Sequence, residues 1–361
     1  MNSIIPEVSP LVLFLTLGVA MVVCVNGSAI GARLHVMSHP DQHRRKHRIA
    51  TPQVGGIAIL LGLVTWLAGT LLAGNTDENF MVVILLSVLG VGAVGFADDQ
   101  KEISPLARMI LLIVFLGAAF TIEPRFVADK LNWGSFASTP ITLWFYMPLM
   151  CATAVGLVNA VNMADGQNGV VGGLFSVWAG CLLLVMSGPS AALAAVIMGL
   201  SLVFLAFNIP GRIFLGDCGS YGVTFILGLL VAFAHAQGRL SLDTIIVWFF
   251  IPVMDCVRLL VSRPLRGYSP FEGDRDHFHH RLQDRIGKPL GLSTYVGTVG
   301  TSSVIATVAP RFALVCLCAL CAFYFSFAWL TDAATDSESR KNDSDGKVVS
   351  LEEANKRHHA S

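Results

Sequence analysis

The sequence predicts an all-α, polytopic integral membrane protein with about eleven transmembrane helices. Hydrophobic residues make up 54% of the chain and charged residues 13%, and the mean hydropathy is +0.67. Charged residues make up about 25% of a typical soluble domain, so this composition is typical of a membrane protein. The formal charge balances to zero, which gives no field for a nucleic-acid partner. Apolar segments long enough, or nearly so, to cross a bilayer as helices lie at about 10–32, 53–73, 80–97, 106–122, 140–161, 170–187, 190–207, 219–236, 243–261, 292–309 and 312–331.

Lys and Arg are divided unevenly among the connections between these segments. The connections after odd-numbered segments carry fourteen of them, whereas the N-terminus and the other connections carry four. By the positive-inside rule, the odd-numbered exits are cytoplasmic. We therefore expect a multi-pass protein of the bacterial cytoplasmic (inner) membrane, with a periplasmic N-terminus and a cytoplasmic C-terminus. Residues 1–331 are expected to form one membrane domain, and the polar residues 332–361 a disordered cytoplasmic tail.

The connections on the predicted cytoplasmic face carry the polar residues that a reaction needs. They are the loops 34–52, 98–105, 159–169, 208–220 and 262–291. On the opposite face, one connection is longer than the others. Its aromatic residues Phe126, Trp133 and Phe136 favour a small hairpin at the membrane interface.

Two adjacent carboxylates, Asp98 and Asp99, follow directly after the apolar segment 80–97. A charged pair is costly inside lipid, so we expect it at the water boundary. Adjacent aspartates repel each other unless a cation or a proton separates them, and a metal ion is the natural partner. A solvated helix end explains these two residues about equally well.

The first and third loops offer groups for a phosphate-bearing ligand. The first is strongly basic around Lys46, although attraction to anionic lipid explains the same charges. The third places Asn159, Asn162, Asp165 and Asn168 at the membrane edge, where polar side chains need partners. Its glycines let the backbone approach a ligand closely.

The fourth and fifth loops add a carboxylate and a group of cations. Glycines on both sides of Asp217 leave room for a cation, and the ring of Phe214 suits either a nucleobase or packing. In the fifth loop, arginines favour anion binding, since Arg recognises phosphate with two hydrogen bonds. The three histidines also keep a zinc site open. The donors of this loop are Arg266, Arg275, His277, His279 and His280.

Taken together, the loops resemble the polyprenyl-phosphate N-acetylhexosamine-1-phosphate transferases. The resemblance covers the chain from about residue 44 to residue 282, and its last motif is closest to the WecA-like branch. Asn168 departs from the pattern, because the family often has an aspartate there; an amide can still bond a uracil edge. The shared motifs are, in order, Thr51-Pro-x-x-Gly55-Gly56, Asp98-Asp99, Asn159-x-x-Asn162-x-x-Asp165-Gly, Phe214-Leu-Gly216-Asp217-x-Gly219-Ser220 and Asp274-Arg275-x-His277-x-His279-His280.

The resemblance implies transfer of N-acetylhexosamine 1-phosphate, with GlcNAc 1-phosphate expected, from a UDP-sugar to undecaprenyl phosphate. The products are a polyprenyl-diphosphate sugar, which initiates a cell-envelope polysaccharide, and UMP. The implied cofactor is Mg²⁺ or Mn²⁺, since the reaction brings several negative charges together. Two alternatives stay open: the phospho-MurNAc-pentapeptide transferase of peptidoglycan synthesis, and a polytopic transporter, although a transporter usually has a midplane site. A homodimer also stays open.

These implications assign a role to each candidate residue. Asp217 is expected to be the principal metal ligand, with Asp98 as a second ligand. Asp98 and Asp99 are expected to bind or deprotonate the lipid phosphate, and Asp165 to orient the nucleotide side, so these three are the catalytic candidates. Substrate binding is expected from Lys46, Asn159, Asn162, Asn168, Phe214, Arg266, Arg275, His277, His279 and His280.

Overall fold

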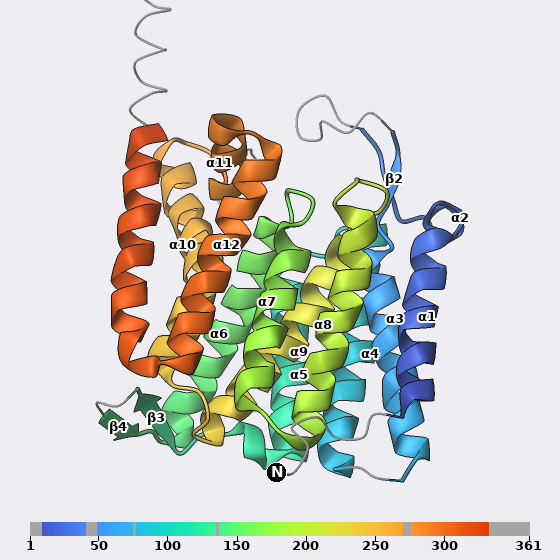
Figure 1. Ribbon diagram of the computed structural model, residues 1–361, viewed down its shortest axis with the longest axis horizontal. Helices are drawn as coiled ribbons and strands as arrows, with labels where there is room; N and C mark the ends of the chain where they lie inside the picture. Colours follow the sequence, from blue (N-terminus) through green and yellow to red (C-terminus); the bar gives the residue numbers. More distant parts are fainter. Residues whose placement is uncertain (1–8, 41–48, 75–76, 135–136, 270–275, 332–361) are drawn as a thin grey trace, which may run out of the picture. The chain divides into compact units, whose positions relative to one another are not determined.

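The computed structural model describes residues 9–40, 49–74, 77–134, 137–269 and 276–331. The chain divides into two compact units, 1–317 and 318–361. In the second unit the described residues are helical. The first unit is a helical bundle with two short antiparallel hairpins (Figure 1). Its main elements are α1 (Pro10–Val25), α2 (Gly27–Arg33), β1 (Met37–Ser38), β2 (Thr51–Pro52), α3 (Gly55–Leu72), α4 (Glu78–Gln100), α5 (Pro105–Ile122), β3 (Lys130–Trp133), β4 (Ala137–Pro140), α6 (Leu143–Ala164), α7 (Val170–Val185), α8 (Gly188–Asn208), α9 (Gly216–Ala236), α10 (Leu242–Leu265), α11 (Phe278–Ile286) and α12 (Lys288–Val308).

The fold class predicted from the sequence is confirmed, because the described residues form an all-α, polytopic membrane protein. Eight of their helices are long and apolar enough to cross a membrane, including a last one at Pro310–Thr331. A ninth span results if α1 and α2, which are bent by 74° at Asn26, are taken together. Helix α7 is shorter, and α12 does not reach the same hydropathy. Eleven spans and the orientation of the ends therefore stay predictions.

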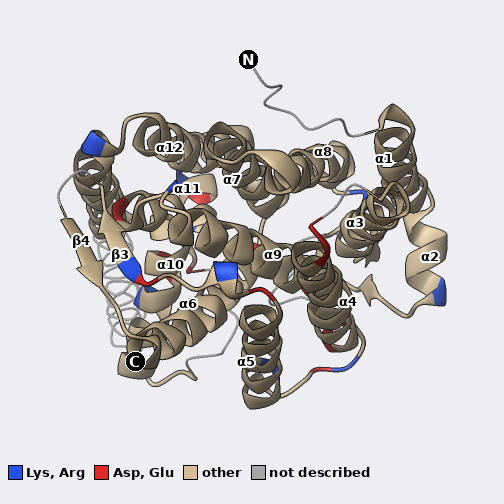
Figure 2. Cartoon of the chain, turned by 90° about the horizontal axis from the view of Figure 1, so that it is seen from below, with Lys and Arg blue, Asp and Glu red and all other residues tan. Residues whose placement is uncertain are grey.

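Helix α9 is the inner helix of the first unit. It packs against α3, α4, α6 and α7, and Figure 2 shows it surrounded by the other helices. Within its most apolar 18-residue window, 89% of the residues are buried, compared with 22% in α5 and 28% in α6. The outer faces of α5 and α6 are therefore the ones left for lipid, while α9 serves as the scaffold for its neighbours.

Glycines allow two helices to approach the start of α9 at backbone distance. A Cβ atom on Gly56 of α3 would lie 2.1 Å from the backbone nitrogen of Gly219. A Cβ atom on Gly95 of α4 would lie 2.3 Å from the carbonyl oxygen of Asp217. No side chain fits at either position, so the two glycines fix where α3 and α4 meet α9.

The two ends of the first unit differ. One end carries α2, the β1–β2 hairpin and α11, and the opposite end carries the β3–β4 hairpin (Figure 1). The first of these is called the site end below. The hairpin predicted from the sequence on the opposite face is confirmed, in the register Lys130↔Pro140 to Trp133↔Ala137.

One aromatic residue assigned to that interface is placed differently. Phe126 is fully buried, and its ring packs against Phe80 and Phe233 at 6.0 and 5.5 Å between centroids. The prediction of an interfacial position was wrong for Phe126, because its side chain is buried in the core of the bundle. Trp133 is 38% exposed, and Phe136 lies outside the described residues.

Candidate active site

The start of α9 is held by a carboxylate from α4. The backbone nitrogens of Asp217 and Cys218 donate to the two oxygens of Asp99, at 2.8 and 2.9 Å. The first N–H groups of a helix lack partners within the helix and attract negative charge. Gly216 has a φ of +75°, and a Cβ atom there would lie 2.8 Å from an oxygen of Asp99. This explains why glycine precedes Asp217.

Asp217 is in turn oriented by α6. The Asn162 amide donates to Oδ1 of Asp217 at 2.6 Å and to the hydroxyl of Ser220 at 3.0 Å. Asp165 follows Asn162 by three residues, at the end of the same helix, so the two share a face. Burial, followed by the negative charges of Asp217 and Asp99, raises the pKa of the Asp165 carboxyl well above its usual range.

The hydrogen bonds between Asp99 and the start of α9, together with the charge interaction of Asp165 with both other carboxylates, place Asp99, Asp165 and Asp217 near one another at the site end. Like charges in such a group disfavour one another unless a cation lies between them. Carboxylate and amide oxygens are the ligands that Mg²⁺ uses in proteins. The residues present therefore fit a magnesium ion, with Asp217 and Asp165 as the carboxylates that would hold it.

Asp98 turns away from this group, although it adjoins Asp99 in sequence. Its buried carboxylate accepts from the Arg108 guanidinium at 2.9 Å and from the Tyr221 hydroxyl at 2.7 Å. The backbone nitrogen of Ile103 donates to its other oxygen at 2.7 Å. Successive residues on a helix point about 100° apart, so Asp98 and Asp99 contact different groups. This geometry favours a role in holding Arg108, and metal ligation by Asp98 stays a prediction.

Three of the predicted loops are joined through their backbones. Gly55 donates to the carbonyl of Phe214 at 2.9 Å, and the Phe214 nitrogen donates to the carbonyl of Pro52 at 2.9 Å. The buried Asn208 side chain accepts from the backbone nitrogen of Gly169 at 2.7 Å. The motifs around residues 51–56, 159–169 and 208–220 thus share one rigid framework around the start of α9.

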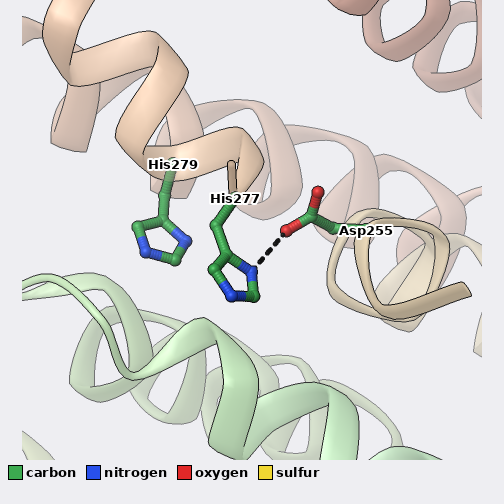
Figure 3. A group of neighbouring side chains, drawn as sticks. All are labelled: Asp255, His277 and His279. Carbon is green, nitrogen blue, oxygen red and sulfur yellow. Dashed lines mark hydrogen bonds and ion pairs between the residues drawn. The ribbon is translucent and has the colours of Figure 1, made fainter. Parts of the chain in front are cut away.

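The fifth loop is bound to a carboxylate that the sequence interpretation did not include, Asp255. Residues 276–281 are called the histidine segment. Nδ1 of His277 lies 3.0 Å from Oδ2 of Asp255, a residue of α10 (Figure 3). Asp255 also accepts from the backbone nitrogen of Phe278 at 3.1 Å and from the Arg258 guanidinium at 2.9 Å. The start of α11 is therefore fixed to α10 by an ionic network.

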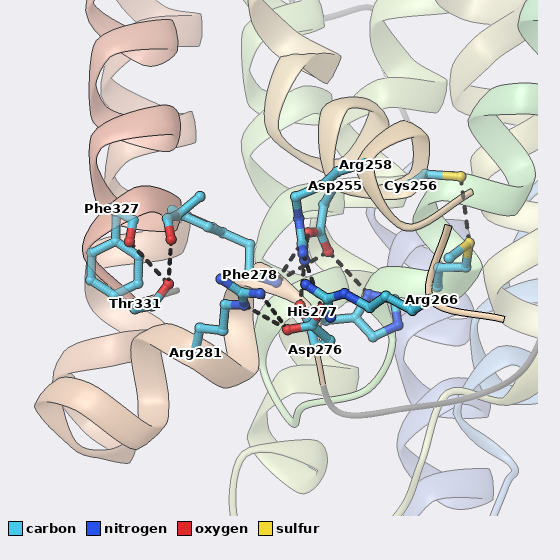
Figure 4. Close-up of polar contacts among 12 residues, drawn as sticks. Asp255, Cys256, Arg258, Arg266, Asp276, His277, Phe278, Arg281, Phe327 and Thr331 are labelled. Atoms are coloured by element: carbon cyan, nitrogen blue, oxygen red, sulfur yellow. Dashed lines mark hydrogen bonds and ion pairs between the residues drawn. The ribbon is translucent and has the colours of Figure 1, made fainter. Parts of the chain in front are cut away.

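Arginines surround Asp276 at the start of the histidine segment. Its carboxylate accepts from Arg281 at 2.8 Å, from Arg266 at 3.1 Å and from Arg258 at 3.3 Å (Figure 4). Arg266, a predicted substrate ligand, is paired here but keeps 54% of its side chain exposed. The two carboxylates of Asp255 and Asp276 among three guanidinium groups leave this group of side chains with a net positive charge.

The acidic and cationic parts of the site meet at Gly166. A Cβ atom on this glycine would lie 2.7 Å from Nε2 of His279 and 3.0 Å from Nε2 of His280. The rings of His277 and His279 are stacked, with centroids 5.3 Å apart. The histidines therefore lie against the turn that follows Asp165, and a ligand at the carboxylates has cationic and imidazole groups beside it.

The other predicted site residues are less closely tied to this centre. The Asn159 amide donates to the Val155 carbonyl of its own helix at 2.8 Å, and Asn168 lies beside Gly211. Lys46 and Arg275 lie outside the described residues. Their binding roles stay predictions.

Asp255, Arg258 and Arg108 are the functional candidates that sequence reasoning missed. Asp255 and Arg258 interrupt an apolar segment, three residues apart. An ionisable residue inside a membrane segment is by default a candidate for function, and carboxylate and guanidinium at this spacing face each other on a helix. That signal was present in the sequence.

Comparison with known proteins agrees with this site. The model of the family "Glycosyl transferase family 4" matches residues 81–235. A probable undecaprenyl-phosphate N-acetylglucosaminyl 1-phosphate transferase of Bacillus subtilis is 27% identical over 70% of this chain and 71% of its own. An undecaprenyl-phosphate alpha-N-acetylglucosaminyl 1-phosphate transferase of Thermotoga maritima is 29% identical over 72% and 77%.

A phospho-N-acetylmuramoyl-pentapeptide-transferase of Shouchella clausii is 31% identical, over 67% of this chain and 78% of its own. This degree of identity over most of a relative's length, together with the family match across α4 to α9, extends the similarity beyond the separate motifs. The chain therefore belongs to glycosyl transferase family 4, the polyprenyl-phosphate hexosamine-1-phosphate transferases.

Proposed function

We propose that the protein transfers N-acetylhexosamine 1-phosphate from a UDP-sugar to undecaprenyl phosphate and releases UMP. The observation that carries the proposal is the meeting of Asp99, Asp165 and Asp217 with the histidine segment at one end of the bundle. A phosphate that attacks a diphosphate needs its charges neutralised and its atoms aligned, and little else. The two parts of this site supply both needs.

The carboxylates act at the reacting phosphates. A bound Mg²⁺ would supply charge neutralisation and polarise the phosphoryl oxygens. Asp217 would hold it with Asp165, while Asn162 keeps the Asp217 side chain in place. Asp99 fixes the start of α9 and lies beside the same centre, where it is placed to accept a proton from the lipid phosphate.

The lipid substrate is assigned to the junction of α5, α6 and α9. A small apolar hollow there, too narrow to enclose a prenyl chain, is lined by residues that include Leu116, Met150, Leu157 and Phe225. Arg108 and Tyr221 lie on the same two helices, α5 and α9, toward the site end. A prenyl chain lying along this junction would bring its phosphate toward a guanidinium and toward Asp99.

The sugar nucleotide is assigned to the histidine segment and the turn 165–169. Arg266 and Arg281 supply cations for a diphosphate, and Asn168 supplies an amide for a uracil edge. Relatives named for GlcNAc and for phospho-MurNAc-pentapeptide are similarly identical to this chain. We favour UDP-GlcNAc, because Arg281 follows His280 at the point where the other branch has an acid after its histidines.

The proposal is tested with purified protein, undecaprenyl phosphate, Mg²⁺ and a panel of UDP-sugars. UMP release is expected with UDP-GlcNAc, and it should require the lipid. UMP release only with UDP-MurNAc-pentapeptide would show that the protein is a phospho-MurNAc-pentapeptide transferase. A transporter would move a UDP-sugar across vesicles without releasing UMP.

The proposed orientation makes a separate prediction about the two ends of the bundle. Ser138 of β4 and Lys288 of α12 are both exposed, at opposite ends. In intact cells, a membrane-impermeant maleimide should label Ser138→Cys and should spare Lys288→Cys until the membrane is opened. The unsubstituted protein, with its eight cysteines, gives the background. The reverse labelling pattern would show that the orientation in the membrane is opposite to the proposed one.

A further inference from the structure

The strongest unassigned feature is the carboxylate of Asp255 behind the histidine segment. Asp255 is 4% exposed and His277 is 7% exposed, so both side chains are shielded from bulk solvent. Nδ1 of His277 lies 3.0 Å from Oδ2 of Asp255, and because a carboxylate oxygen accepts, Nδ1 is the donor in this contact. A carboxylate at this distance selects the imidazole tautomer that keeps a hydrogen on Nδ1.

The orientation of the ring follows from that contact. The two nitrogens of an imidazole diverge, so with Nδ1 on Asp255 the Nε2 edge of His277 turns away from α10. Figure 3 shows this ring between Asp255 and the ring of His279. The His277 and His279 rings are inclined by 17°, and His279 meets the turn at Gly166. Asp255 thus contacts His277, His277 stacks on His279, and His279 lies against the turn after Asp165.

Arg258 also binds the backbone of the histidine segment. Its guanidinium bonds the carboxylate of Asp255 and the carboxylate and carbonyl of Asp276. The Phe278 nitrogen, at the start of α11, also donates to Asp255. Two residues of α10 therefore determine where the histidine segment begins.

A metal site is the competing interpretation. One ligand atom each from Asp255, His277 and His279 lie within 4.8 Å of one another. Both oxygens of Asp255, however, already accept hydrogen bonds from cationic or N–H donors. Arg258 contacts this carboxylate directly, and a divalent cation would have to displace these donors beside a guanidinium. The charges favour positioning of an imidazole over ligation of a metal.

We infer that Asp255 is a positioning residue for the UDP-sugar: it orients His277, and through it the stacked histidines that meet the Asp165–Gly166 turn. This inference rests on the proposed function, because it takes the histidine segment as the sugar-nucleotide site. On this inference Asp255 acts through His277 and not by contact with a substrate. Its effect should therefore disappear when His277 is absent, which separates it from a general structural role.

The test is a double-mutant cycle on binding of UDP-GlcNAc, measured by calorimetry with the full-length protein in detergent and Mg²⁺. Asp255→Asn replaces one acceptor oxygen with a donor, and we expect the Kd to rise about tenfold. In the His277→Gln background the same substitution should change the Kd less than about twofold. Asp243→Asn, at the other end of α10, is the matched control and should leave the Kd unchanged.

Each other outcome contradicts the inference in its own way. An equal increase in both backgrounds, or a wild-type Kd in Asp255→Asn, would show that Asp255 does not act through His277. Zinc in the purified protein that is lost in Asp255→Asn would establish the metal site instead. UMP assays on the same samples separate the two proposals: binding without turnover refutes the proposed reaction alone, whereas absence of binding by the unsubstituted protein refutes both.

Discussion

Replacing Asp217 with asparagine is expected to lower kcat at least about 100-fold, which corresponds to about 2.7 kcal/mol of barrier. The same variant should need more Mg²⁺ for half-maximal rate. The amide oxygen can still accept from Asn162, which donates to Asp217 at 2.6 Å, so the local structure should survive while the charge is lost. The measurement is a Mg²⁺ titration of UMP release with both substrates saturating.

Asp129→Asn is the control for this substitution. Asp129 is an exposed carboxylate beside the β3–β4 hairpin, at the end opposite the site. It should keep the wild-type rate and the wild-type Mg²⁺ dependence. A wild-type rate and Mg²⁺ dependence in Asp217→Asn would remove Asp217 from the metal site.

Gly56→Ala is expected to have the second large effect, although no chemistry is changed. The added methyl would lie 2.1 Å from the backbone nitrogen of Gly219, so α3 and α9 must separate. Overpacking of this kind destabilises by about 1–3 kcal/mol, and a displacement of about 1 Å at a reacting centre can reduce the rate about 100-fold. Asp217 is two residues from the contact. We expect a lower melting temperature together with a turnover reduced at least about 10-fold.

Gly156→Ala provides the matched comparison. Gly156 lies in α6, and among the described residues no atom outside the adjoining part of its own helix lies within 4 Å of an added Cβ. Alanine favours a helix over glycine, so melting temperature and turnover should be kept or raised. Equal behaviour of the two variants would show that the close approach of α3 to α9 does not position Asp217.

The sequence was sufficient for the fold class and for the gathering of most candidate motifs at one end, because both depend on local patterns. Apolar segments form helices in a bilayer since no other local structure satisfies the backbone there. The loops at Thr51, Asn162, Asp217 and His277 meet at one end because alternating spans return their polar connections to the same side. Their order along the chain already implied this.

The directions of side chains could not be predicted in the same way. Nothing in the pair Asp98 and Asp99 says which one binds the first N–H groups of α9 and which one binds Arg108 and Tyr221; only the packing of α4 separates them. Phe126 was expected at the interface because it is an aromatic residue in a connection between spans. Its burial depends on residues far away in the chain, such as Phe233, and could not be predicted from the local sequence. Asp255 was not predicted because it lies inside an apolar segment, away from the polar loops.

The most direct test of the central claim follows the two phosphorus atoms of the UDP-sugar. Transfer of a sugar 1-phosphate breaks the bond between the two phosphates. With ³²P next to uridine, we expect all the released label in UMP, and with ³²P next to the sugar, all of it in the lipid fraction. Release of both labels together as UDP would mean transfer of the sugar alone, and it would contradict the proposed reaction.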